Sequence, residues 1–364
     1  MTNAEWNTIS FPGFGIEIPV YSTAFTLFGM EIKWYAILIA LGGFIAVNYC
    51  FRKMKSVGID DDRATDVVFW GFIGALIGAR LYYVLMSWNE NNWDLKSIIS
   101  IRDGGLAIYG GIIGALLIGG LVAKIRKVRL LPLLDLVGLG FLIGQSIGRW
   151  GNFCNHEAFG SNTTLPWGMT SPRIQYAIEL SAERSYELNG VTMDPSIPVH
   201  PCFLYESLWC VIGFVFLHFY FKHRKFDGEI FFMYAGWYGL GRFFIEGLRT
   251  DSLMVGHIRI SQLVALLSVI AAIAVIIAVR AKIKHDGEYT FYKDTEESKM
   301  LIKQTEDKYA EEERKRQEKK TLKEKAKSAE LSAEDRLVDD EYDETDALKD
   351  TNEKTEDENN GTDN

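Results

Sequence analysis

One short polar run holds the side chains whose types and spacing are best suited to chemistry. It covers residues 148–160, directly after an apolar segment, and contains Arg149, Asn152, Asn155 and Glu157. On a continuing helix the two asparagines share a face with Arg149. A charged side chain at membrane depth costs about 2.5 to 3.5 kcal/mol on insertion scales, so a retained arginine indicates a task such as ligand binding. The simpler alternative is an arginine that extends to the lipid headgroups, and this run alone does not separate the two.

The composition divides the chain into two different polymers. The whole chain carries a net charge of −9, but residues 286–364 contain 27 acidic and 15 basic residues and account for −12. Residues 1–285 therefore carry +3, and they are rich in Phe, Trp, Gly, Leu and Ile. This contrast predicts a membrane domain over 1–285 and an acidic, charged cytoplasmic tail over 286–364, disordered or partly helical. The four cysteines form no metal-type or disulfide pattern, and no removable signal peptide is expected.

Hydropathy predicts an all-α integral membrane protein with seven transmembrane helices. Each apolar segment is close to the roughly 20 residues that are needed to cross about 30 Å of hydrocarbon. The predicted spans are 34–51, 67–88, 107–125, 130–147, 203–221, 230–245 and 260–279.

The basic residues of the short connections predict the orientation. They gather in alternate connections, at residues 52–63, 124–129, 222–225 and 280–284. Because cytoplasmic loops carry the excess of Lys and Arg, the N-terminus is expected outside and the C-terminus in the cytoplasm. The connection of residues 161–199, between spans four and five, is then an extracytoplasmic loop region.

This topology brings many polar side chains to the level of the outer leaflet. Tyr238, Arg242, Glu246 and Arg249 are separated by four, four and three residues, which makes one stripe on a helix. The other members are Tyr35, Arg80, Tyr83, Tyr109, Arg149, Asn152, Glu157, His200, Tyr205 and Glu206. A purely structural account would pair Arg242 with Glu246 and Arg149 with Glu157. An excess of arginine near headgroup depth instead favours an anionic phosphate, which arginine can hold with two parallel hydrogen bonds. An anionic phospholipid is the expected ligand, and Asp135, a lone buried acid, has no predicted partner.

The polar run closely resembles the signature of the prolipoprotein diacylglyceryl transferases. Further matching blocks follow along residues 17–282 in the order of that family. They are Trp34-Tyr35, Gly78-Ala79-Arg80 with Tyr83, Gly104-Gly105-Leu106, His200-Pro201 with Leu204-Tyr205-Glu206, and Tyr238-Gly239 with Arg242, Glu246 and Arg249.

The resemblance implies an enzyme that begins lipoprotein maturation in the bacterial plasma membrane, with its active site toward the outer leaflet. Such a transferase moves the diacylglyceryl group of phosphatidylglycerol to the lipobox cysteine of a prolipoprotein signal peptide, and glycerol-1-phosphate leaves. It uses no metal or cofactor, and its partners are membrane lipids rather than nucleic acid. By position, Arg149 and Arg242 bind the phosphoglycerol headgroup. The remaining predicted substrate-binding residues are Asn152, Glu157, Tyr35, Glu246, Arg80 and Tyr238.

The identity of the general base stays open in the sequence. Tyr109 stands where many relatives have a histidine that is a proposed base for the thiol, and a free tyrosine has a pKa near 10. Tyr109 is therefore a tyrosinate, a hydrogen-bond donor to phosphate, or an interfacial aromatic residue. His200, with an ordinary pKa well placed for proton transfer, is the other candidate base.

Two other classes of protein are alternatives to the transferase. A transporter or flippase of an anionic lipid or solute would also place arginines in the membrane. The seven segments show no internal repeat and no pair of interrupted helices, which counts against a transporter. A receptor-like or scaffold protein would act through the acidic tail, but such charged blocks are usually solvated and carry no chemistry.

Overall fold

The computed structural model describes residues 3–88, 94–99, 105–183, 192–250, 254–255 and 258–357. The chain forms two compact units, residues 1–302 and residues 303–364. The first unit contains every predicted site residue. It extends past residue 285, where the composition changes, and ends within the long helix α11 (Glu296–Asp357).

Six helices of the described chain are long and apolar enough to cross a membrane, judged by length and composition. They are α2 (Trp34–Lys53), α3 (Asp61–Met86), α5 (Ile108–Ile125), α6 (Leu130–Asn155), α8 (Cys202–Tyr220) and α10 (Ile260–Asp286). The seventh predicted span corresponds to α9 (Glu229–Leu248), which is not one of these six and which contains Arg242 and Glu246 among glycines and tyrosines. A mostly helical, multi-pass membrane protein is thus confirmed, while the count of seven spans and their direction remain predictions.

Three of these helices extend six or more residues beyond the apolar runs that mark them in the sequence, and one of them, α10, ends at Asp286 rather than at residue 279. Helix α3 begins six residues before the predicted span, and its start is capped by the Asp60 side chain, which accepts the Arg63 N–H at 3.0 Å. Helix α6 continues through the polar run as far as Asn155. Arg149 and Asn152 therefore lie on the last turns of α6, because backbone hydrogen bonding continues where hydropathy no longer indicates a span.

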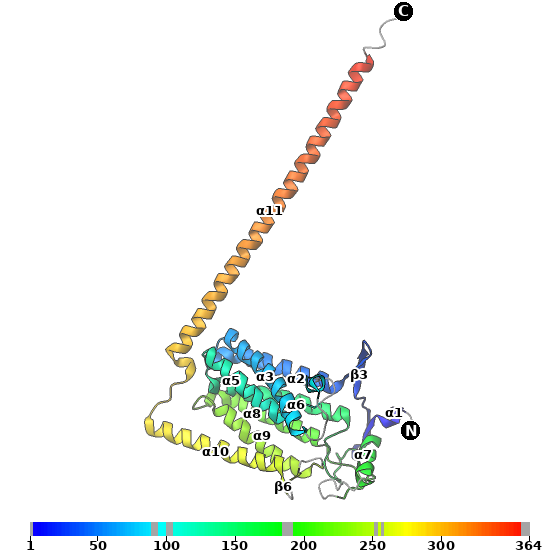
Figure 1. Ribbon diagram of the computed structural model, residues 1–364, viewed down its shortest axis with the longest axis vertical. Coiled ribbons are helices and arrows are strands. Elements are labelled where there is room, and N and C mark those ends of the chain that lie inside the picture. The colour runs from blue at the N-terminus through cyan, green and yellow to red at the C-terminus, as the bar shows by residue number, and fades with distance from the viewer. Residues whose placement is uncertain are drawn as a thin grey trace, which may run out of the picture. The chain divides into compact units, whose positions relative to one another are not determined.

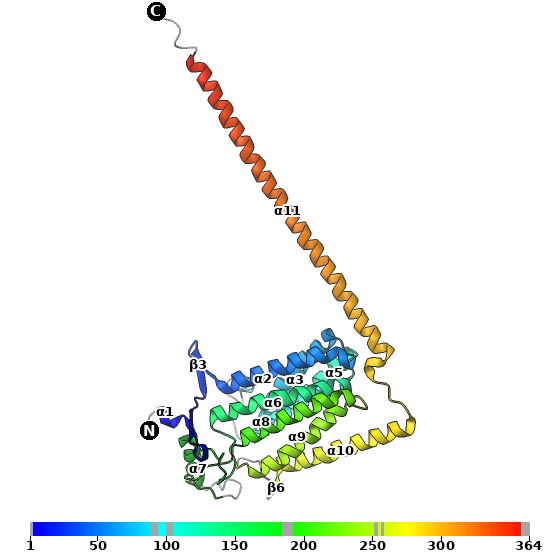
Figure 2. The ribbon, with the colours of Figure 1, turned by 180° about the vertical axis from the view of Figure 1, so that it is seen from behind.

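Close helix packing depends on glycines. Helices α3 and α5 pack on each other, α2 packs on α6, and α9 packs on α6, α8 and α10. A Cβ atom at Gly78 would lie 2.3 Å from the Gly110 carbonyl oxygen, and one at Gly114 would lie 2.1 Å from that of Gly74. These contacts leave no room for a side chain at these glycines, which lie four residues apart on each helix and let the two backbones approach closely. Figures 1 and 2 show the helices of the bundle, α2, α3, α5, α6, α8, α9 and α10, lying side by side.

Short elements gather at the end of the bundle where α2 begins and α6 ends, as Figures 1 and 2 show for β3, α1 and α7. They are α1 (Asn3–Trp6), the antiparallel pair β1 (Thr8–Phe11) and β2 (Ile16–Pro19), the antiparallel pair β3 (Thr23–Leu27) and β4 (Met30–Lys33), the 3₁₀ turn η1 (Pro12–Phe14), α4 (Leu95–Ile99), α7 (Pro172–Glu183), and the pair β5 (Met254–Val255) and β6 (Ile258–Arg259). A separate hydrophobic core lies here, with Ile9, Phe153, Met169, Ile174 and Val199 among its buried members. This core supports the end of α6 from outside the bundle.

The opposite end of the bundle is closed by the turns η2 (Met54–Val57), η3 (Phe221–His223) and η4 (Tyr292–Asp294). Asp135 lies here, fully buried, and it does have partners: its carboxylate accepts the backbone N–H of Gly228 at 2.9 Å and that of Phe231 at 3.1 Å. The Arg224 side chain lies 3.7 Å from the same carboxylate. Asp135 of α6 therefore caps the start of α9, a contact between segments that are far apart in the sequence.

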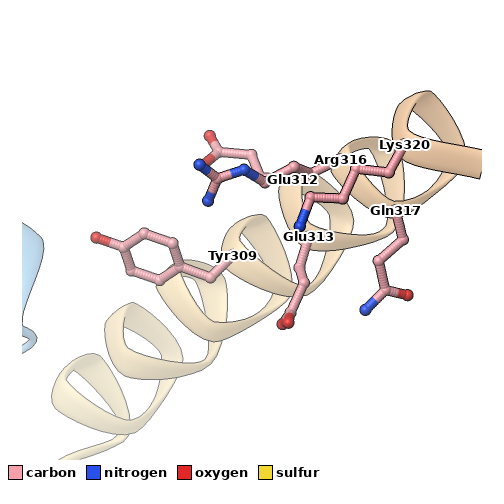
Figure 3. A pocket seen from close by; sticks show the side chains of 6 residues that line it. All are labelled: Tyr309, Glu312, Glu313, Arg316, Gln317 and Lys320. Atoms are coloured by element: carbon pink, nitrogen blue, oxygen red, sulfur yellow. The ribbon is translucent and has the colours of Figure 1, made fainter. Parts of the chain in front are cut away.

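Helix α11 is charged and solvent-exposed over residues 306–326. Glu311 and Lys315 pair at 2.6 Å one turn apart, as is typical of an exposed helix. Figure 3 shows a shallow hollow lined by Tyr309, Glu312, Glu313, Arg316, Gln317 and Lys320. All six side chains project from this one helix, so the hollow is a groove between neighbouring side chains, and we assign it no chemistry.

Candidate functional site

A single buried carboxylate organises three arginines at the end of the bundle where α6 ends. Glu206, near the start of α8, is 4% exposed. Its carboxylate lies 2.8 Å from Arg149 Nη2, 3.1 Å from Arg242 Nη1 and 3.3 Å from Arg249 Nη1. Arg242 Nη2 also lies 2.5 Å from Glu246 Oε2, and Glu246 is 1% exposed. We call these five residues the arginine cluster.

The arginine cluster carries a positive surplus, because three guanidinium groups face two carboxylates. The carboxylates are the deepest members, whereas the side chains of Arg149 and Arg242 remain 22% and 19% exposed. Burial of a charged group costs free energy unless an opposite charge is paired with it. The two glutamates therefore offset the cost of burying the arginines. An anion with several acceptor oxygens, such as a phosphate, would balance the remaining charge and can accept hydrogen bonds from guanidinium N–H groups.

Two tryptophans and two glycines set the register between α8 and α9, and hence the position of Glu206 opposite Arg242. The rings of Trp209 and Trp237 stack at 4.5 Å, and each indole N–H donates to the backbone carbonyl of the other residue, at 2.8 and 3.0 Å. Gly241 leaves room for the Trp209 ring, since a Cβ atom there would lie 2.3 Å from it. Gly213 does the same for Trp237. A slip of one turn along either helix would break both hydrogen bonds.

The end of α6 is held by His156, which has a left-handed backbone conformation with φ of 57°. Its buried ring contacts Ser171 Oγ at 2.9 Å and the Val20 carbonyl oxygen at 3.0 Å. Burial lowers the pKa of His156. Because a carbonyl only accepts, the ring donates from Nε2, and Nδ1 can accept from Ser171 when the imidazole is neutral. His156 therefore fastens the last turn of α6 to the N-terminal strands.

Glu157 does not pair with Arg149, in contrast to the purely structural account of the sequence. Its Oε1 accepts the side-chain amides of Asn152 at 3.0 Å and Asn155 at 3.1 Å. Arg149 instead pairs with Glu206, while the pair between Arg242 and Glu246 is present.

Two tyrosines contact the last turns of α6, Tyr238 at Arg149 and Tyr35 at Gly151. Tyr238 Oη accepts a hydrogen bond from Arg149 Nη2 at 3.4 Å, and its ring stacks on Tyr234 at 6.0 Å. Tyr35 lies on the backbone of α6, because a Cβ atom at Gly151 would be 2.6 Å from its ring. The first turn of α2 is thereby placed beside the polar run. The structure brings both predicted tyrosines to the signature end of α6.

Arg80 binds backbone carbonyl groups rather than the carboxylates of the arginine cluster. Its guanidinium donates to the backbone carbonyls of Ser97 at 2.5 Å, Gly105 at 2.9 Å and Ile98 at 3.0 Å. Gly105 has φ of +75°, and a Cβ atom there would collide with the side chains of Arg80 and Tyr83. Gly104, which belongs to the same family-like block, lies outside the described residues. Arg80 therefore positions the segment that leads into α5.

Tyr109 occupies the first turn of α5, and its side chain is exposed. Its hydroxyl makes no hydrogen bond with the part of the chain that the structure describes. The hydroxyl is therefore available to a ligand, in keeping with a donor at the rim of a site.

His200 belongs to a short chain of polar rings. Trp167 Nε1 donates to Tyr205 Oη at 2.7 Å, and Tyr205 Oη lies 3.1 Å from His200 Nδ1. Since an indole N–H can only donate, the tyrosine hydrogen is free to point at His200 Nδ1, which leaves the neutral imidazole protonated at Nε2. Burial lowers the pKa of His200, so the neutral form prevails near pH 7. Gly160 N donates to the His200 carbonyl at 2.9 Å, which joins His200 to the end of the signature.

Glu206 and Arg249 are functional candidates that the sequence analysis did not select as site residues. Both stand in blocks that resemble the family, so the signal was visible, but residue spacing within one helix does not reveal that Glu206 of α8 meets arginines of α6 and α9. Among the described residues, no His, Cys, Asp and Glu side chains gather into a group that could hold a metal ion.

The fold and the site define a helical membrane protein with a buried arginine cluster of positive surplus at one end of its bundle. A family model described as "Prolipoprotein diacylglyceryl transferase" matches residues 22–278, and the chain belongs to this family of enzymes. Relatives named phosphatidylglycerol--prolipoprotein diacylglyceryl transferase include those of Clostridioides difficile (40% identical over 250 residues, 69% of this chain and 92% of the relative) and Finegoldia magna (41% over 266 residues, 73% and 98%). A relative of the same name from Staphylococcus haemolyticus is 40% identical over 261 residues, 71% of this chain and 88% of its own length.

Proposed function

We propose that this protein transfers the diacylglyceryl group of phosphatidylglycerol to the lipobox cysteine of bacterial prolipoproteins, with release of glycerol-1-phosphate. The single observation that carries this proposal is the arginine cluster, in which Glu206 holds three arginines within 3.3 Å. Membership of the transferase family supplies the reaction, and the positive surplus of the cluster matches the anionic headgroup. The substrates are a membrane lipid and a signal peptide that lies in the same membrane.

The proposed chemistry is a displacement at carbon. The cysteine sulfur forms a bond to the phosphate-bearing carbon of the diacylated glycerol. The bond between that carbon and the phosphate oxygen breaks, and its electron pair leaves with the glycerol-1-phosphate. Arg149 and Arg242 bind the phosphate and stabilise the charge that grows on it. Because these donors are already fixed by Glu206, little reorganisation is needed as the reaction proceeds. The arginines therefore contribute more to the rate than any general base.

Tyr109 acts in this proposal as a hydrogen-bond donor, and the departing phosphate accepts the thiol proton. The exposed hydroxyl of Tyr109 supports a donor role. His200 is less suited to accept the proton through Nδ1, because Tyr205 already contacts that nitrogen. Asn152, Glu157, Tyr35, Glu246 and Tyr238 shape the headgroup site, and Arg80 positions the segment before Tyr109.

We further propose that α9 is the seventh membrane span, with the N-terminus outside and the arginine cluster at the outer leaflet of the plasma membrane. Helix α9 has 20 residues, enough for about 30 Å. Its start is capped by Asp135 at one end of the bundle, and its last turn reaches the cluster at the other. The basic connections, which include Arg126 and Arg129, lie at the end opposite the cluster, in agreement with a cytoplasmic position.

The decisive experiment is transfer by the purified full-length protein. A synthetic lipobox peptide incubated with phosphatidylglycerol is expected to gain one diacylglyceryl group in thioether linkage, detected by mass spectrometry. The gain should persist in EDTA. A peptide with serine in place of the lipobox cysteine is the matched control and should stay unmodified. An unmodified cysteine peptide, with the protein shown to be folded, would refute the enzyme and favour a transporter of anionic lipid.

A further inference from the structure

A short segment beyond the family match is built into the membrane unit. The family model ends at residue 278, whereas the first compact unit ends at residue 302. Residues 287–302 follow α10 and contain η4 and the first turns of α11. We call them the strap. The strap contacts three connections of the helix bundle, all at the end opposite the arginine cluster.

The first contact is with the connection between α8 and α9. Asp227 is buried, and its Oδ2 accepts the backbone N–H of Tyr292 at 2.8 Å and the hydroxyl of Tyr289 at 3.3 Å. The Tyr289 hydroxyl in turn accepts the Asp227 N–H at 3.2 Å. The ring of Phe291 lies 5.1 Å from the guanidinium of the buried Arg224. This connection is also the one that Asp135 caps, so the strap joins the network that fixes the start of α9.

The second contact is with the connection between α2 and α3. Ser298 is fully buried, and its hydroxyl donates to the Gly58 carbonyl at 2.6 Å. Gly58 has φ of +80°, and a Cβ atom there would lie 2.4 Å from Lys293 Cα. The strap backbone therefore rests directly on a glycine that no other residue can replace without strain.

The third contact is with the connection between α5 and α6. Arg129 Nη2 lies 3.2 Å from Glu297 Oε2, and the Arg129 guanidinium lies 5.9 Å from the Tyr292 ring. The ion pair is exposed and contributes little free energy. The Tyr292 ring matters more, because it is buried in the same hydrophobic core as Met54, Val57 and Phe221.

We propose that the strap is an integral clamp of the membrane unit, which fastens the ends of helices that do not otherwise pack closely together. Helices α3 and α5 pack on each other, while α8 and α9 pack with α6. The strap contacts the connections of both groups at once. The apolar anchor of the strap is the Tyr292 ring. Its polar anchors are the Ser298 hydroxyl, which bonds to the Gly58 carbonyl, and the Tyr292 N–H, which bonds to Asp227. The acidic part of α11 beyond residue 302 is not required for this clamp.

Hydrogen exchange on the full-length protein in detergent tests the proposal without any substitution. Helix α11 runs through the end of the first unit, so one helix supplies both the test segment and its control. Backbone amides of residues 289–302 are expected to exchange about tenfold or more slowly than those of residues 306–326, because they open only with the clamp. Equal exchange in the two segments would overturn the proposal.

Two matched substitutions extend the test. Tyr292→Ala removes the buried anchor and should lower the melting temperature by several degrees and abolish the slow exchange of the strap. Tyr309→Ala makes the same change at an exposed tyrosine of α11 and should alter neither. If Tyr292→Ala does not fold, Ser298→Ala, which deletes only the hydroxyl that bonds to Gly58, should still speed the exchange of the strap. An unchanged melting temperature in Tyr292→Ala, or unchanged exchange in Ser298→Ala, would contradict the clamp.

Discussion

The most informative substitution is Glu206→Gln, because one carboxylate holds three arginines. Glutamine keeps the shape of the side chain but removes the charge, so three guanidinium groups would face the carboxylate of Glu246 alone. Breaking a buried ion pair by removing one partner costs about 3 to 5 kcal/mol, which sets the expected loss in the free energy of unfolding. The guanidinium groups can reduce their mutual repulsion by moving apart. Their N–H donors would then no longer lie where the phosphate binds.

The expected loss of transfer follows from the number of donors that move. Removal of one preorganised donor from an anionic transition state costs about 2.7 to 4 kcal/mol, or about 10²- to 10³-fold in rate. Arg149 and Arg242 both contact Glu206, so the loss for Glu206→Gln should reach at least that range. Smaller losses would mean that the arginines keep their positions without the carboxylate.

The assay is the rate of mass gain on the lipobox peptide at matched amounts of folded protein. Glu31→Gln is the control, since Glu31 is exposed and pairs with Lys33 on a surface strand; exposed pairs contribute about 0 to 1 kcal/mol, so this variant should behave as the unmodified protein does. A normal rate for Glu206→Gln would refute the idea that Glu206 organises the phosphate site.

Four further predictions follow from the same geometry. Arg149→Lys keeps the charge but loses the two-pronged donor, and it should lose about 10²-fold or more in transfer rate, whereas Arg126→Lys, at an exposed pair with Asp66, should turn over normally. Tyr109→Phe should lose only about 1 to 2 kcal/mol of transition-state stabilisation with an unchanged pH profile; an inactive variant that still binds phosphatidylglycerol would show that Tyr109 is the base. Truncation after Ile302 should leave both the melting temperature and the transfer rate intact, while truncation after Lys284 should lower the melting temperature because it removes the strap; identical melting curves would contradict this difference. Burial lowers the pKa of His156 in the folded protein. As the pH falls, His156 is therefore protonated in the unfolded chain before it is protonated in the folded protein, which favours unfolding. The stability that neutral His156 contributes is complete above about pH 6.5 and is lost as the pH falls from there toward the folded pKa. The melting temperature should therefore drop between pH 7.5 and 5.5, less steeply in His156→Gln than in the unmodified protein, and parallel slopes would count against the assignment.

Local patterns in the sequence were enough for the class of protein and for most of the polar residues that the structure brings to the end of α6. Apolar runs mark the helices because a helix needs about 20 consecutive apolar residues to cross the hydrocarbon core of a membrane. The run of residues 148–160 indicates a functional site, because its polar residues are not needed for a helix to span a membrane. Its resemblance to the family signature indicates the transferase family. Spacing along α9 also predicts the pair of Arg242 and Glu246, because residues four apart on a helix are neighbours.

The ends of elements were harder to predict. Hydropathy ends the fourth span at residue 147, yet α6 continues to Asn155, because a helix needs only backbone hydrogen bonds and a cap, which His156 provides in the left-handed conformation. For the same reason composition assigns residues 287–302 to the tail. Their anchors, Tyr292 and Ser298, are single residues in a charged context, so no average over a window reveals them.

What the sequence by itself determined is the long apolar helices, the transferase family and the choice of Arg149 and Arg242 as candidate residues. Only the tertiary structure decided the partners: Glu206 rather than Glu157 for Arg149, backbone carbonyls of the preceding segment for Arg80, and the start of α9 for Asp135. The physical reason is that a partner on another helix depends on rotation and register. Those are set by glycine contacts and by the reciprocal hydrogen bonds of Trp209 and Trp237, which act between segments that have no fixed spacing in the chain.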